Sequence, residues 1–372
     1  MRQELPALTS LRFFAAAMIV ATHANERIFT THDWGPLASG VSLFFVLSGF
    51  ILFHVYGEAV ENGRMRQFFL ARFARVWPMH VAAVFMFMVL MKPHFHLPEW
   101  TIVLSNITLV QGWIPLPRYN FSFNGVAWSI SAEFAFYLLF PFLASNFSKT
   151  WHWKWMLSVV VVVLMIALCQ IYRIDSYNPT VNGVSTFTLL YTNPVARVME
   201  FISGMVVYLI FKKISQRNFN ALLATIIEVA LIAAISAMIV YWRQIYDAAF
   251  DVSRSFADWQ KFCGPFPLYS ALILMFAVGR GRVSVFLKNR IFVYLGETSF
   301  ALYMVHQIIN HFWVNHFQGL MRGNMPMFFI SYLLVTMVVA AMGYQFIEMP
   351  ARKFILKYNF RGISRAVSEV RN

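Results

Sequence analysis

Long apolar stretches separated by short polar segments cover almost the whole chain. A transmembrane helix needs about 20 predominantly apolar residues to cross the hydrocarbon core of a bilayer. Ten stretches come close to that length: 7–27, 39–57, 76–92, 124–144, 153–172, 194–211, 220–242, 262–279, 292–313 and 326–347. The pattern predicts an all-α polytopic membrane bundle of about ten transmembrane helices, with a single membrane domain over 1–358 and a basic tail at 359–372.

A further apolar stretch, at 98–116, is shorter and is bounded by prolines. It begins at Pro98 and is closed by Pro115 and Pro117. Short apolar segments with helix-breaking ends are typical of re-entrant or interfacial structure. We expect one of these two arrangements here, although the sequence also leaves a full span open.

Composition and charge support the membrane assignment and give it a direction. The chain has 372 residues, of which 59% are hydrophobic and 12% are charged, with a formal net charge of +14. The basic residues interrupt apolar runs and form no extended basic tract, so we expect no nucleic-acid partner. With the N-terminus inside, most of the 30 Lys and Arg residues fall on the cytoplasmic side, which predicts an N-in, C-in topology. The two cysteines, Cys169 and Cys263, lack metal-ligand spacing, and no metal site is expected.

The first span carries two polar residues, Arg12 and His23. They are eleven residues apart, which corresponds to about 16 Å along a helix and almost three whole turns. They therefore share one face, and intramembrane charges usually face the bundle interior or a wet cavity. The pattern predicts a polar path inside the bundle. Taken singly, Arg12 could also snorkel to the cytoplasmic surface, and His23 could be an interfacial residue.

Two later spans carry polar residues at helical spacing. Ser129 and Glu133 are four residues apart and lie on one face, and we expect Glu133 to pair with His23. A structural hydrogen bond between helices is the alternative for Glu133. In the ninth span a polar stripe recurs at intervals of four, three and four residues: Ser299, Tyr303, His306 and Asn310. For His306 alone, an ordinary interhelical hydrogen bond is equally compatible with the pattern.

A pair of arginines, Arg72 and Arg75, lies on one helical turn just before Pro78. Guanidinium groups bind phosphate through two parallel hydrogen bonds, so a pair at the mouth of a bundle can anchor a phosphorylated ligand. The competing interpretation is ordinary cytoplasmic positive charge.

Together these elements resemble membrane-bound acyltransferase family 3. The resemblance rests on six blocks in the family's order: Arg12 with His23, GVSLFFVLSGFIL (40–52), RFARVWP (72–78), WSISAEFAFYLLFP (128–141), SFALYMVHQ (299–307) and FIEMPAR (346–352). Some members carry an additional C-terminal hydrolase-like domain, which we do not expect in this chain, so we expect the reaction to use the membrane domain alone or a separate periplasmic acyltransferase as a partner.

The resemblance implies an enzyme that moves an acyl group, usually acetyl, from cytoplasmic acyl-CoA to a sugar hydroxyl of a polysaccharide or its lipid-linked precursor. The acceptor would be at the outer side of a bacterial cytoplasmic membrane, and no permanently bound cofactor is implied. His23 would be the general base, with Glu133 orienting it. Arg12 would be a third catalytic residue and, together with Arg72 and Arg75, would hold acyl-CoA. The remaining positions would stabilise the oxyanion or line the acceptor path: Tyr303, His306, Ser129 and Trp128.

Three alternatives remain at this point. His23 could carry the acyl group covalently instead of acting as a base. A secondary transporter or exporter would also accommodate intramembrane Arg, Glu and His residues, although the chain has no repeated halves. A non-catalytic receptor would leave the alignment of Arg12 and His23 without a purpose.

Overall fold

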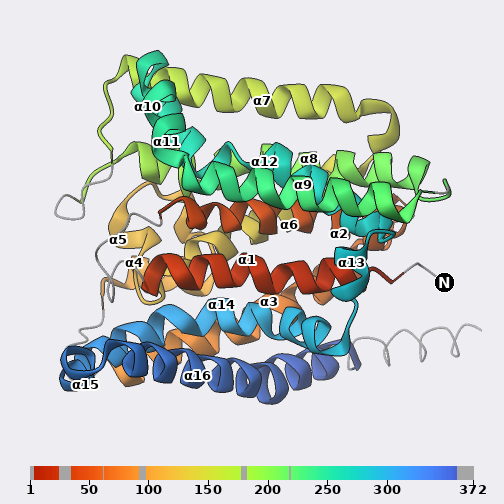
Figure 1. The fold of residues 1–372 in the computed structure, drawn as a ribbon. Coiled ribbons are helices and arrows are strands. Elements are labelled where there is room, and N and C mark those ends of the chain that lie inside the picture. Colours follow the sequence, from red (N-terminus) through yellow and green to blue (C-terminus); the bar gives the residue numbers. More distant parts are fainter. Residues whose placement is uncertain are drawn as a thin grey trace, which may run out of the picture.

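A computed structural model describes residues 4–24, 35–61, 63–91, 98–176, 182–217 and 219–357. Within these ranges the chain forms helices joined by turns and contains no β-strand, which confirms the all-α prediction (Figure 1). The basic tail predicted at 359–372 lies outside the described residues.

Ten long helices form the bundle. They are α1 (Pro6–Ala24), α2 (Gly40–Glu61), α3 (Met65–Leu90), α6 (Trp128–Ala144), α7 (Phe147–Ile171), α8 (Pro194–Ile214), α9 (Ala221–Val240), α12 (Phe266–Val278), α14 (Arg290–His316) and α16 (Met325–Gly343). In the described part of the chain, nine helical segments are long and apolar enough to cross a membrane. The 27-residue α14 is not among these nine because its polar stripe lowers its hydropathy, but it is long enough to span.

Short helices connect the long ones. The α-helices are α4 (Trp100–Ile107), α5 (Pro117–Asn120), α10 (Trp242–Val252), α11 (Arg254–Cys263), α13 (Arg282–Phe286) and α15 (Gln318–Gly323). There are three 3-10 helices, η2 (Gly35–Ser39), η3 (Gln111–Trp113) and η4 (Gly125–Ala127), and two π-helices, η5 (Phe187–Tyr191) and η6 (Tyr344–Glu348). The region 98–116 thus contains only α4, of 8 residues, and a single 3-10 turn, which is too short to span the bilayer.

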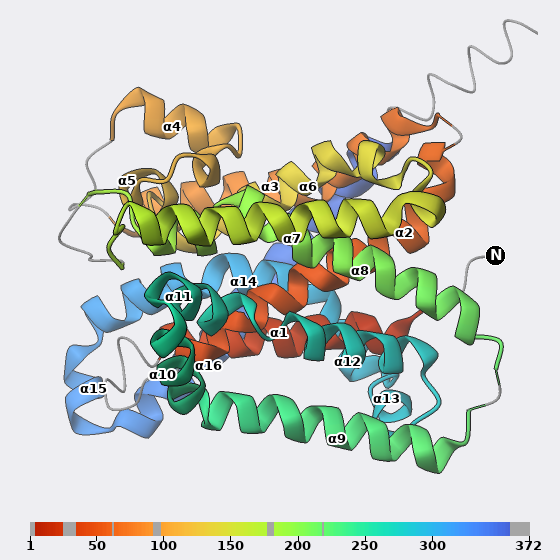
Figure 2. The same ribbon diagram turned by 90° about the horizontal axis from the view of Figure 1, so that it is seen from above.

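The two ends of the bundle differ. The chain's N-terminal side and α13 lie at one end, whereas α4, α5, α10, α11 and α15 gather at the other (Figures 1 and 2). We call these the inner end and the outer end, following the predicted topology. The last long helix runs back to the inner end, as an even number of crossings requires (Figure 1).

The helices near the centre pack closely through small residues. Gly296 of α14 lies against the backbone of α1, where an added Cβ would come 2.0 Å from the carbonyl oxygen of Thr9. Gly49 of α2 and Gly204 of α8 lie against each other's helices in the same way. Small residues allow such close backbone approach between membrane helices. By contrast, the apolar windows of α7 and α9 are each 17% buried, so these helices lie at the periphery.

The third helix begins earlier than predicted, at Met65 instead of residue 76. Arg72 and Arg75 lie on one helical turn, as predicted, but this turn belongs to α3 itself, and Pro78 lies in the helix interior. A hydropathy criterion treats the two arginines as a break. In the structure both side chains find partners inside the bundle, so the helix continues through them.

Candidate active site

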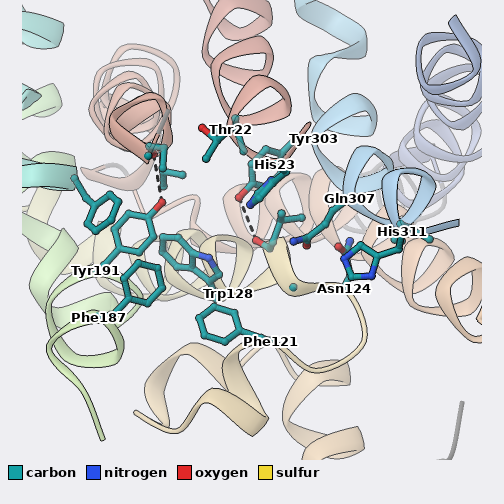
Figure 3. Close-up of a pocket in the computed structure, with 18 of the residues that line it drawn as sticks. Thr22, His23, Phe121, Asn124, Trp128, Phe187, Tyr191, Tyr303, Gln307 and His311 are labelled. Carbon is teal, nitrogen blue, oxygen red and sulfur yellow. Dashed lines mark hydrogen bonds between the residues drawn. The ribbon is translucent and has the colours of Figure 1, made fainter. Parts of the chain in front are cut away.

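A cavity of about 500 Å³ lies in the outer half of the bundle, where α1, η4, α6 and α14 meet. One side is aromatic, with Trp128, Tyr191 and Phe187, and the other carries Asn124, Gln307 and His311 (Figure 3). His23, in the last turn of α1, lies beside Tyr303 between these two sides (Figure 3). This outer cavity has the size and the mixed apolar and polar lining of a ligand site.

His23 is held by a second imidazole. Its Nδ1 lies 2.9 Å from Nε2 of His306, and the two ring planes are 23° apart. Nδ1 of His306 faces the carbonyl oxygen of Tyr303 at 2.7 Å. A carbonyl only accepts, so Nδ1 of His306 donates and its Nε2 accepts from His23. These partners assign the proton of neutral His23 to Nδ1 and leave a lone pair on its Nε2, which is the form a general base requires.

The polar stripe of α14 faces the interior of the bundle, beside α1. His306 and Asn310 are both fully buried, and Asn310 donates a 3.0 Å hydrogen bond to the carbonyl oxygen of His23. Ser299 lies nearer the inner end of the same face. The stripe thus holds the end of α1 that presents His23.

A second, inner cavity of about 50 Å³ lies deeper in the bundle. Val41 and Tyr303 line both cavities and so mark the point where they meet. Arg12, Arg72 and Arg75 all line the inner cavity. Arg12 and His23 therefore lie along one continuous helix and line two adjacent cavities, as the polar path predicted.

Glu133 does not pair with His23, contrary to our expectation. It accepts a 2.6 Å hydrogen bond from the hydroxyl of Tyr137 and a 3.3 Å hydrogen bond from Ser48, and it interacts electrostatically with Arg12. The two residues lie at different depths in the bundle. Helix α6 begins at Trp128 near the outer end, so Glu133 is already in its second turn and faces the inner cavity, whereas His23 is in the last turn of α1.

The two arginines of α3 have protein partners. Arg72 donates a 3.0 Å hydrogen bond to the hydroxyl of Tyr56 and lies over that ring, 4.9 Å from its centre. Arg75 forms an ion pair with the buried Glu348 of η6. Nε of Arg72 is buried without a hydrogen-bond partner and remains available to an anion, whereas Arg75 is already paired with a carboxylate.

At the junction, Tyr303 and Ser129 are hydrogen-bonded to each other at 2.7 Å, and the Tyr303 hydroxyl also lies 3.1 Å from the carbonyl oxygen of Val126. Trp128 belongs to the aromatic side of the outer cavity, where its ring centre lies 4.6 Å from that of Tyr191. All the site residues predicted from the sequence thus line one of the two cavities or, in the case of His306, contact a residue that does.

The sequence analysis missed a buried ion pair under the outer cavity. Arg197 and Glu200 of α8 are 0% and 1% exposed, and Nε of Arg197 lies 2.6 Å from Oε2 of Glu200. Arg197 also donates to Ser42 and to the carbonyl oxygen of Tyr191. The available signal was an Arg and a Glu three residues apart inside a predicted span.

Two amide side chains of the outer cavity were also missed. Oδ1 of Asn124 and Oε1 of Gln307 are buried and have no hydrogen-bond partner in the protein. Buried polar atoms are normally paired, so these two oxygens are available to a bound ligand. For Gln307, the available signal was its position midway between Tyr303 and His311, four residues from each, next to the polar stripe on the same helix.

An imidazole pair at the outer cavity, next to the Tyr303 junction with the inner cavity and with cationic side chains beyond it, is an arrangement suited to group transfer within the membrane. A family model described as an acyltransferase domain matches residues 5–344. The chain therefore belongs to acyltransferase family 3 and is a multi-pass membrane O-acyltransferase.

The chain is also similar to curated proteins. Acyltransferase MdmB of Streptomyces mycarofaciens is 28% identical over 331 residues, covering 82% of this chain and 79% of MdmB. O-acetyltransferase OatA of Staphylococcus aureus (strain MW2) is 24% identical over 371 residues, covering 94% of this chain and 57% of OatA. Peptidoglycan O-acetyltransferase OatA of Listeria monocytogenes is 24% identical over 223 residues, 55% of this chain and 33% of that protein. No solved structure matches the chain.

Proposed function

We propose that the enzyme transfers an acetyl group from cytoplasmic acetyl-CoA, through the bundle, to a sugar hydroxyl of a polysaccharide or its lipid-linked precursor. The membrane is the bacterial cytoplasmic membrane. The observation that carries the proposal is the hydrogen-bonded pair of His23 and His306 at the outer cavity, next to Tyr303, where the two cavities meet. The names of the OatA relatives support an acetyl group, and the name of the Listeria relative supports a glycan acceptor.

The donor would occupy the inner cavity. Acetyl-CoA carries phosphates at one end and a thioester at the end of a slender arm, and Arg12, Arg72 and Arg75 provide three cations along the inner route. At about 50 Å³ the cavity has no room for the arm, so the lining side chains must move when the donor enters. The phosphates would replace Glu348 as the partner of Arg75 and Tyr56 as the partner of Arg72.

The acceptor would occupy the outer cavity, with its hydroxyl on Nε2 of His23. Nε2 takes the hydroxyl proton as the acceptor oxygen attacks the thioester carbon, and His306 stabilises the imidazolium by accepting from Nδ1. The C–O bond forms, the C–S bond breaks, and the proton on His23 passes to the departing CoA thiolate. Asn124 and Gln307, whose side-chain oxygens have no protein partner, would bind further hydroxyls of the sugar.

A periplasmic acyltransferase is the proposed protein partner. A glycan at the membrane surface can reach the outer cavity, whereas an acceptor fixed in the cell wall away from the membrane would need a second protein to receive the acyl group and carry it further. An acyl-histidine on His23 is the covalent variant of the same site.

The test is His23→Ala in the purified, full-length protein. We expect loss of acetyl transfer by a factor on the order of 100 or more, because acid–base catalysis contributes that much. His152→Ala is the matched control, since His152 is exposed on α7 and should not affect transfer. Retention of most activity in His23→Ala would remove His23 from the reaction. Labelled protein formed from acetyl-CoA without an acceptor would identify the covalent variant.

A further inference from the structure

A second cavity at the outer end, of about 450 Å³, adjoins the outer cavity. Three residues line both: Phe187, Lys261 and Phe262. The rest of its lining comes from the segment before η5 and from α10 and α11: Ser176, Thr186, Trp242, Arg243, Tyr246, Asp247 and Asp258. We call it the side cavity. The side cavity therefore adjoins the outer cavity around His23, and the three shared side chains form the wall between the two cavities.

We propose that the side cavity binds the sugar units adjacent to the one that is acylated, so that the enzyme recognises an extended glycan acceptor. This inference rests on the proposed function, because it requires a glycan in the outer cavity. It adds a second binding site and makes chain length a determinant of acceptor choice.

The aromatic lining suits pyranose rings. The Trp242 and Tyr246 ring centres lie 6.2 Å apart on successive turns of α10, and Phe187 and Phe262 stand edge to face, 5.4 Å apart, on the shared wall. One face of a sugar ring presents C–H groups that pack against aromatic rings, while the hydroxyls project outward to polar groups. A row of aromatic residues from the shared wall to α10 can hold consecutive units of a glycan.

The polar lining is built around a fixed carboxylate. Oδ2 of Asp258 accepts hydrogen bonds from Ser176 at 2.7 Å and Thr186 at 2.6 Å, and its Oδ1 accepts one from Tyr246 at 2.9 Å. These donors come from separate segments, so Asp258 joins the walls of the side cavity together. Two carboxylate oxygens offer about four acceptor positions, which leaves capacity for a sugar hydroxyl.

The charges of the lining favour a neutral ligand. Two acidic side chains, Asp247 and Asp258, balance two basic ones, Arg243 and Lys261. The ammonium of Lys261 also lies over the Trp242 ring, 4.5 Å from its centre. A site for a phosphorylated headgroup would need a surplus of positive charge, because it must compensate the anion. The balance thus argues for a glycan over a phospholipid.

The position of the side cavity also fits an acceptor from the outer side. Helix α10, of 11 residues, crosses the end of the bundle instead of running along it (Figure 1). Together with α11 it lies at the outer end in both views (Figures 1 and 2). A glycan lying along this end would place one unit in the outer cavity, near His23, and its neighbours in the side cavity.

The experiment compares short and long acceptors of the same sugar. Purified full-length protein is given labelled acetyl-CoA with glucose, galactose, mannose or N-acetylglucosamine, and with the linear tetrasaccharide of each. For a sugar that is acetylated, we expect kcat/KM to be roughly tenfold higher with the tetrasaccharide, which corresponds to about 1.4 kcal/mol. Trp242→Ala should remove this advantage and leave transfer to the monosaccharide unchanged.

Two matched controls lie beside the substituted residues. Tyr241→Ala removes an exposed aromatic ring adjacent to Trp242 that does not line the side cavity. Asp247→Asn changes a residue that lines the side cavity. Its control is Asp251→Asn, one turn further along α10 and outside the cavity. Both controls should keep the preference for the tetrasaccharide, while Asp247→Asn should reduce it.

The outcomes separate this inference from the proposed function. Equal use of the monosaccharide and the tetrasaccharide by the wild type, or an equal loss with both acceptors in Trp242→Ala, overturns the second site and leaves the proposed function standing. Transfer to none of the sugars, with acetyl-CoA hydrolysis to water still measurable, contradicts the glycan acceptor itself and this inference with it.

Discussion

The two cavities that meet at Tyr303 differ tenfold in volume, about 500 Å³ on the outer side against about 50 Å³ on the inner side. The outer cavity is already large enough for a small ligand, and it presents unpartnered amide oxygens. The inner cavity is closed by its own arginines and their partners. Under the proposed function, the acceptor site would thus be formed in advance, whereas the donor site would have to open when acyl-CoA binds.

The contacts around each cavity explain this difference. Beside the outer cavity, the Arg197–Glu200 pair is completely buried, and Asn124 donates a 2.8 Å hydrogen bond to the carbonyl oxygen of Met304. Such contacts can be broken only at a large cost, so the wall is rigid. Around the inner cavity, Arg75 is also paired with a buried carboxylate, but its own side chain is 14% exposed, and a ligand phosphate would give it a new anionic partner.

The largest effect is expected from breaking the rigid wall. Arg197→Leu leaves Glu200 buried without a cation and should destabilise the protein by about 3–5 kcal/mol. The double variant Arg197→Leu with Glu200→Leu should recover much of that loss, because no buried charge remains. Thermal unfolding in detergent measures both. A single variant as stable as the wild type would show that the wall does not depend on the pair.

The next largest effect is expected from removing the residue of the outer half that holds the reacting base in position. His306→Ala removes the acceptor for Nδ1 of His23 and should lower kcat about 10- to 100-fold, because the base loses its orientation and its proton assignment. The KM for acetyl-CoA should not change. His306→Gln, which retains an acceptor oxygen, should restore part of the rate, and His316→Ala, exposed at the end of α14, should have no effect. Equal rates for His306→Ala and the wild type would refute this role.

Substitutions at the inner cavity should change the KM for acetyl-CoA and leave kcat almost unchanged. Arg75→Ala should raise the KM for acetyl-CoA roughly tenfold with little change in kcat, since a charged hydrogen bond contributes about 1.5–3 kcal/mol. Glu348→Gln should lower this KM, because it frees Arg75 for the donor phosphates. Steady-state kinetics at varied acetyl-CoA concentrations measure both, with Arg64→Ala, exposed before α3, as the control. A KM that stays the same in both variants would leave Arg75 a structural residue.

Much of the bundle and the axis of the site followed from helical periodicity. The polar face of α1 and the stripe of α14 could be predicted because residues at spacings of three, four or eleven share a face whatever the neighbouring helices are. The same rule placed Ser129 and Glu133 together on one cavity. Positive-inside charge gave a topology in which both ends of the described chain lie at one end of the bundle (Figure 1).

Periodicity shows which residues share a helix face, but it does not show which helix packs against that face. Glu133 finds Ser48 and Tyr137 instead of His23 because α6 packs against α2, α3 and α8 at that depth. The Arg197–Glu200 pair was overlooked because the predicted span 194–211 is apolar enough on average to hide two charged residues. Helix α3 was predicted to begin too late because hydropathy ends an apolar span at charged residues, even where the helix continues through them.

The most direct test of the account is the sidedness of the reaction. Full-length protein is reconstituted into sealed vesicles of known orientation, with labelled acetyl-CoA on the face that carries the N-terminus and the acceptor sugar only on the opposite face. The account predicts acetylated sugar in the wild type and none above background in His23→Ala. Product formed only when donor and acceptor share one face would contradict a path that runs through the bundle past His23.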